Sequence, residues 1–138
     1  FVLAALSTGG SHAYSPVQVQ KLFFIIDSEL SDELGKKYFD FKPYHYGPFD
    51  REVYSTLAQL AASGFVEVLG DSWTTKREYR LTPEGLERGK SEFARLPEKV
   101  REYISSVSDF IRTHSFSQLV SAVYKHYPEM AVNSVFKS

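Results

Sequence analysis

The stretch from Asp50 to Leu69, DREVYSTLAQLAASGFVEVL, decides the fold. Its apolar residues recur at the spacing of one helical face, and Asp50 is a good N-cap for the helix that they define. Ser63-Gly64 ends that helix, and the strand-like run Phe65–Leu69 follows at once. The sequence therefore predicts a helix over residues 50–63 that leads directly into a strand. Its predicted buried face consists of Val53, Tyr54, Leu57, Leu60 and Ala61.

The residues after this stretch predict a second strand and another helix. Gly70-Asp71-Ser72 is a turn signal, and Trp73 to Leu81 returns as the second strand of a hairpin. Thr82 and Pro83 suit the cap and the first position of a following helix. A helix that precedes a two-stranded hairpin has the order of a winged helix, in which the helix is the recognition element and the hairpin, here 65–81, is the wing.

Helices are also predicted on both sides of this unit. Phe1–Leu6 is expected to end a helix, and Ser15, Pro16 and Gln18 form a capping box for the next. That helix carries five consecutive apolar residues, 22–26, so we expect it to be central and buried. The acidic stretch Asp27–Glu33 is interpreted as a solvated helix end and loop rather than a metal or acid–base site.

Two more helices are predicted after Pro97, separated by a break at His114-Ser115. The fold class is therefore mainly α with a small β-hairpin. We expect a winged-helix-like core with N-terminal helices over residues 1–96, and a C-terminal helical extension, 97–138, packed on the same domain. The tail over residues 127–136 either pairs with a second subunit, giving a homodimer, or covers its own core.

The residues YHYGPFDREVY, 44–54, predict a corner at the entry to the helix over 50–63. Gly47-Pro48 is expected to turn the chain, and Phe49 and Tyr54 have the spacing of a hydrophobic staple. His45, between two tyrosines, is either an acid–base group or a structural hydrogen-bond donor at a buried corner, and we favour the second. The predicted structural corner comprises His45, Gly47, Pro48, Phe49 and Asp50.

Composition limits the classes of function. The chain of 138 residues has a formal net charge of −1, which weighs against strong non-specific nucleic-acid binding. It contains no cysteine, which fits a reducing compartment, and we expect a cytoplasmic protein. No apolar run approaches the ~18 residues of a membrane span, so no membrane association is expected.

The sequence carries none of the common catalytic signatures. The four histidines do not pair at the spacing of a helical metal site, and no nucleophile elbow, phosphate loop or dinucleotide turn is present. We therefore expect no enzyme activity, no metal and no cofactor.

A candidate binding surface combines the helix over 50–63 with the hairpin. Its basic residues suit phosphate contacts, and its short polar residues suit base edges. Glu52, Glu67 and Glu78 lie close by in the sequence and would oppose DNA. An aromatic group, Tyr38, Phe39, Phe41, Tyr44 and Tyr46, allows a small-molecule site, but core packing is the favoured interpretation. The candidate surface consists of Arg51, Ser55, Thr56, Gln59, Lys76, Arg77 and Arg80.

Two resemblances arise from these residues. Leu60–Val66 with Tyr79–Gly85 resembles winged-helix regulators, over residues 50 to 90. Val19–Phe24 with Tyr46–Tyr54 is similar to the Panacea family of antitoxin-like proteins, which more often has valine where this chain has Phe49. This second resemblance implies a protein-binding module that neutralises a toxin, with no catalytic residues. The expected partner is accordingly a toxin-like protein or, if the chain is a transcription regulator, double-stranded DNA.

Overall fold

The structure is a computed structural model that describes residues 1–70 and 77–135. It is mainly helical, with two small antiparallel hairpins, which confirms the predicted class of a mainly α fold with a small β-hairpin. In chain order the elements are α1 (Val2–Ser7), α2 (Pro16–Leu34), β1 (Lys42–Tyr44), β2 (Gly47–Phe49), α3 (Arg51–Ala62), β3 (Val66–Leu69), β4 (Glu78–Leu81), α4 (Pro83–Ala94), α5 (Glu98–Thr113), α6 (Phe116–His126) and a 3₁₀ turn, η1 (Pro128–Ala131).

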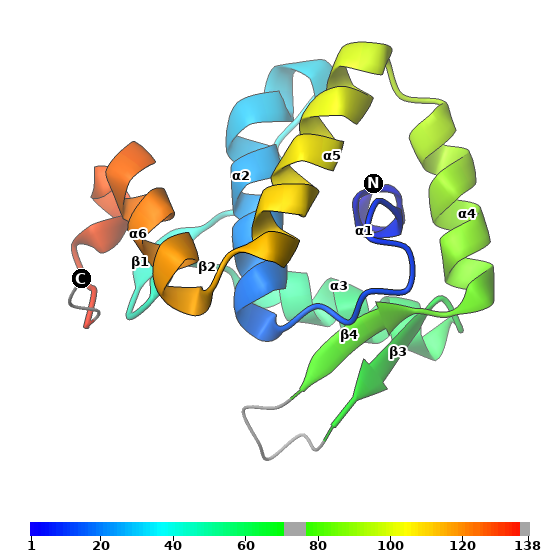
Figure 1. The fold of residues 1–138 in the computed structure, drawn as a ribbon, viewed down its shortest axis with the longest axis horizontal. Coiled ribbons are helices and arrows are strands. Elements are labelled where there is room, and N and C mark those ends of the chain that lie inside the picture. Colours follow the sequence, from blue (N-terminus) through cyan, green and yellow to red (C-terminus); the bar gives the residue numbers. More distant parts are fainter. Residues whose placement is uncertain (71–76, 136–138) are drawn as a thin grey trace.

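The first helix occupies the centre of the molecule. All six residues of α1 are buried, and the helix packs against α4 and α5, as Figure 1 shows with α1 seen end-on between them. The approach to α4 is so close that a Cβ atom on Gly89 would lie 2.4 Å from the carbonyl oxygen of Leu3. Glycine at position 89 therefore lets the two backbones meet.

Helix α2 forms the other half of the core, as its apolar run predicts. Val19, Leu22, Phe23 and Ile26 are fully buried, and α2 packs along α5. The capping box of Ser15 and Gln18 is present, with both of its hydrogen bonds. A single apolar cluster extends from Val2 in α1 to Leu119 in α6, so it crosses the division predicted between residues 96 and 97.

The predicted helix and hairpin over 50–81 are present as α3 followed by β3 and β4, with Lys76 and the other residues of 71–76 outside the described part. Asp50 caps α3, and the rings of Phe49 and Tyr54 meet at 5.8 Å as the staple requires. One further contact holds the hairpin: Tyr14 pairs with Tyr79 in β4 through two backbone hydrogen bonds, both 2.8 Å long. No local pattern around Tyr14 or Tyr79 predicted this bridge.

The prediction that Gly47-Pro48 turns the chain was wrong. Strand β1 covers Lys42–Tyr44, and Gly47-Pro48 belongs to its partner strand β2, so the turn is formed by His45 and Tyr46. Pro43 stands opposite Pro48, where neither residue needs to donate a hydrogen bond to the other strand. Residues around η1 pack against this hairpin, and the Val135 N–H donates to the His45 carbonyl at 2.9 Å, so the tail covers its own chain. No helix in the described residues is long and apolar enough to span a membrane.

Candidate binding surface

The outer face of α3 carries three of the predicted surface residues. Val53 and Leu57 turn inward, and the opposite side of the helix presents Arg51, Ser55 and Gln59. Thr56 does not share this face. It is half-buried and lines a hollow with Leu3 and Leu60, so it points towards α1.

The basic residues of the hairpin are only partly available. Arg80 stands directly across from Glu67, and its guanidinium lies 2.9 Å from the Glu67 carboxylate. This ion pair offsets the charge that was predicted to contact phosphate. Lys76, which was also predicted to belong to this surface, lies outside the described residues.

Arg77 lies beside the aromatic contact that joins the hairpin to α3. The rings of Tyr54 and Tyr79 stack at 6.1 Å, with an interplanar angle of 14°. Burial raises the pKa of the Tyr54 hydroxyl, while its hydrogen bond with Gln20 and the nearby charge of Arg77 oppose that rise. The hairpin is thus fixed to α3 by stacked rings on one side and to Tyr14 on the other.

Acidic side chains share the surface with these basic ones. Glu52 is exposed at the start of α3, and Glu67 and Glu78 are exposed on the hairpin. A surface of mixed charge does not create the positive field that attracts the phosphate backbone of nucleic acid. The arrangement is better suited to polar contacts with a folded protein, where opposite charges are matched group by group.

The entry corner to α3 is held by polar side chains of α2 that sequence reasoning missed. The Lys21 ammonium is buried and donates to the Tyr46 carbonyl at 2.9 Å. Burial lowers the pKa of Lys21 to about 8, because the charged form loses its hydration. Gly47 adopts a φ of +117°, and a Cβ atom added at this position would lie 3.3 Å from the Lys21 ammonium nitrogen. The only sequence signal was a Gln-Lys pair at the start of an apolar run.

Asp27 plays a similar part further along α2, contrary to prediction. The stretch 27–33 was expected to be a solvated helix end, but Asp27 is buried and the helix continues to Leu34. Its two carboxylate oxygens accept hydrogen bonds from the backbone N–H groups of Tyr38 and Phe39, at 2.6 and 3.2 Å. The carboxylate therefore anchors the segment that leads to β1.

His45 also differs from its predicted role. It is exposed at the hairpin turn rather than buried, and its ring stacks on Tyr44 at 4.4 Å. Pro48 and Gly47 are buried, and Phe49 and Asp50 are half-buried, so these four form the structural corner. Among the five aromatic residues expected in the core, Phe39 and Phe41 pack there, whereas Tyr38, Tyr44 and Tyr46 are exposed.

The described residues contain no group of three or more histidine, aspartate and glutamate side chains placed to hold a metal ion. Comparison with known proteins adds no family: no protein-family model matches the chain, and no curated protein matches it.

Proposed function

We propose that this chain is a non-catalytic, protein-binding module of the winged-helix type that acts as an antitoxin-like domain. The binding surface in this proposal is the outer face of α3 together with the hairpin β3–β4. The observation that supports it most directly is the ion pair between Arg80 and Glu67, beside the exposed face of α3. Because Glu67 offsets the charge of Arg80, this surface favours polar contacts with a protein over attraction of the phosphates of nucleic acid. A reducing compartment such as the cytoplasm suits a chain without cysteine.

The second argument for a protein partner is that α3 is rigidly supported. Gln20 and Asp50 fix the start of the helix, and the Tyr54–Tyr79 stack fixes the hairpin beside it. A preorganised surface loses little conformational entropy on binding, which favours a tight complex with a folded partner.

Double-stranded DNA is the alternative ligand. It is favoured by one feature, the presentation of Arg51, Ser55 and Gln59 from one face of a helix that precedes a hairpin. In that case the protein is a transcription regulator that contacts DNA with the helix over residues 50–63 and the wing over residues 65–81.

The experiment that separates the two compares the wild type with a double variant, Arg51→Glu with Gln59→Glu. Lys99→Glu serves as the control, because Lys99 is an exposed residue in the first turn of α5, which begins at the top of Figure 1, whereas α3 lies in its lower part. Each protein is immobilised and exposed to nuclease-treated lysate, and any captured protein is then purified and its affinity measured by calorimetry. We expect the double variant to lose at least tenfold in affinity and the control to bind as the wild type does.

Binding to a mixed-sequence DNA duplex is measured in parallel by fluorescence anisotropy at several salt concentrations. Tight DNA binding that weakens steeply with salt and is lost in the double variant would replace the protein-binding proposal with the DNA-binding one. A partner protein whose affinity is the same for all three proteins would contradict the choice of surface.

A further inference from the structure

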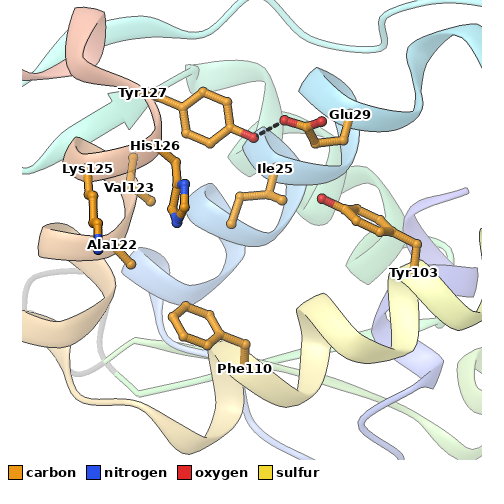
Figure 2. A pocket seen from close by; sticks show the side chains of 9 residues that line it. All are labelled: Ile25, Glu29, Tyr103, Phe110, Ala122, Val123, Lys125, His126 and Tyr127. Carbon is orange, nitrogen blue, oxygen red and sulfur yellow. Dashed lines mark hydrogen bonds between the residues drawn. The ribbon is translucent and has the colours of Figure 1, made fainter.

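A cavity of about 640 Å³ lies between α2, α5 and α6. Figure 2 shows its lining, with Ile25 of α2 on the floor, Phe110 of α5 on one side and the end of α6 on the other. The volume falls within the range of small-molecule sites, which is roughly 300–1,000 Å³. None of the described residues that line it belongs to α3 or to the hairpin β3–β4, so this cavity is separate from the proposed protein-binding surface.

Aromatic side chains from two helices and from the end of α6 surround the opening. Tyr103 and Phe110 project from positions about two turns apart on α5, and Tyr127 follows α6 directly. The faces of such rings carry a partial negative potential that attracts organic cations, most strongly where water is excluded. The apolar floor, which includes Ile25 and the buried Val123, suits a hydrocarbon body attached to the charged group.

One carboxylate stands at the mouth of the cavity. Glu29 of α2 accepts a hydrogen bond from the Tyr127 hydroxyl, drawn as a dashed line in Figure 2. This bond leaves the second carboxylate oxygen for another partner. Burial is the main cause that raises the pKa of the Tyr103 and Tyr127 hydroxyls, and the negative charge of Glu29 raises both pKa values further.

Two basic residues lie on the α6 side. Lys125 and His126 are exposed, and Figure 2 shows the Lys125 side chain beside Ala122, across the cavity from Glu29. The cavity is therefore negative and aromatic at the α2–α5 side. Lys125 lies on the opposite side, and the His126 ring lies between Lys125 and Ile25 in Figure 2.

We propose that this cavity binds a small organic cation, an amine with an apolar body, whose ammonium group lies between Glu29 and the rings of Tyr103 and Tyr127. The apolar body then rests on Ile25 and Phe110. The ligand class follows from the combination of one carboxylate with several aromatic faces, which together compensate an ammonium group for its lost hydration.

Three probes with one apolar body and different head groups test the charge. They are phenethylamine, 2-phenylethanol and 3-phenylpropionate, each titrated into the full chain at neutral pH and followed by amide chemical shifts. We expect phenethylamine to bind at least tenfold more tightly than phenylethanol and to shift amides of α2, α5 and α6. Phenylpropionate should bind most weakly.

Two variants test the site. Glu29→Gln keeps the shape and removes the charge, so it should abolish the preference for the amine while leaving the binding of phenylethanol unchanged. Glu33→Gln is the matched control, because it removes the same charge from an exposed position of α2 outside the lining, and it should preserve the preference. Ala122→Phe should fill the cavity and weaken all three probes, provided its spectrum shows a folded protein.

Several results would overturn the proposal. They are the absence of shifts at α2, α5 and α6 with every probe, equal affinity for the amine and the alcohol, or an amine preference that survives Glu29→Gln. Tightest binding of phenylpropionate would do so as well, because it would assign recognition to Lys125 and His126 instead.

Discussion

Gln20 and Asp50 exchange two hydrogen bonds, each 3.0 Å long, although 30 positions separate them in the chain. The side-chain amide of Gln20 donates to the Asp50 carbonyl and accepts from the Asp50 N–H. A single side chain of α2 thus pairs with backbone groups at the start of α3 as a neighbouring strand would. The placement of α3 depends on this pair, and so does the surface that α3 presents.

Replacing Gln20 with leucine should therefore be costly. The variant removes both hydrogen bonds to the Asp50 backbone beside a buried side chain. It leaves the Asp50 N–H without its partner, whereas the Asp50 carbonyl still accepts a hydrogen bond from the Val53 N–H. A lost buried hydrogen bond costs ~1–3 kcal/mol. With two such bonds we expect the free energy of unfolding, measured by urea titration, to fall by about 2–4 kcal/mol. Gln59→Leu, on the exposed side of α3, is the control and should change it by less than about 0.5 kcal/mol. Equal effects of the two substitutions would contradict the role given to Gln20.

Lys21 should make stability depend on pH in an unusual direction. The pKa of Lys21 is about 8 in the folded protein, whereas its ordinary value, which applies to the unfolded chain, is 10.5. Between these two pH values the Lys21 side chain therefore binds more protons in the unfolded chain than in the folded protein. The free energy of unfolding contributed by this group therefore rises as pH increases from 8 towards 10.5, and below pH 8 its burial cost is fully present.

Comparison with Lys21→Met isolates this effect, because tyrosines and other groups titrate equally in both proteins. We expect the difference in unfolding free energy, wild type minus variant, to increase by a few kcal/mol between about pH 7 and about pH 10. The measurement is a series of urea titrations at constant ionic strength. A difference that is flat or falls over this range would mean that the Lys21 ammonium is not destabilised by burial.

Gly47→Ala should destabilise the corner for two reasons that can be separated. A φ of +117° is a region that residues with a Cβ atom rarely adopt, and the added Cβ would lie 3.3 Å from the Lys21 nitrogen. We expect a loss of about 1–3 kcal/mol in unfolding free energy. Gly35→Ala is the matched control. Gly35 has a φ of +88°, and a Cβ atom added there would meet no other atom within 4 Å, so this substitution reports backbone strain alone. The loss at Gly47 should be the larger of the two.

Gly85→Ala should have an effect through packing rather than backbone strain. A Cβ atom at position 85 would lie 1.9 Å from the Phe65 carbonyl oxygen, so α4 would have to move away from the strand entry. Overpacking of this kind typically costs ~1–3 kcal/mol, in spite of the better helix propensity of alanine. Ser91→Ala, exposed in the same helix, should be neutral or slightly stabilising. Thermal unfolding followed by circular dichroism measures both, and a Gly85→Ala protein as stable as the wild type would show that α4 can shift freely.

The helices could be predicted because their signals are local. Ser15, Asp50, Thr82 and Ser115 all cap the helices that follow them, and each cap depends only on residues within one turn. The order of α3 and the β3–β4 hairpin was predicted for the same reason, from Gly64 and from Thr82-Pro83.

The rest depends on contacts between distant residues. Pro43 and Pro48 argue against strands when they are considered singly, but opposite each other in β1 and β2 they occupy positions that need no ladder hydrogen bond. Lys21 and Asp27 look like surface charges in the sequence, and their burial follows only from the segment 38–47 that lies over α2. The cavity beside Glu29 was missed because its lining comes from three helices, and its acidic residue was assigned to a solvated stretch.

The burial of α1 has a consequence for how the chain reaches this fold. Leu3 meets Gly89, so the apolar residues of α1 find their final neighbours only after α4 has been synthesised. Until Ala94 at the end of α4 has been synthesised, the nascent chain carries an uncovered apolar segment, which is the kind of surface that chaperones bind and that promotes aggregation.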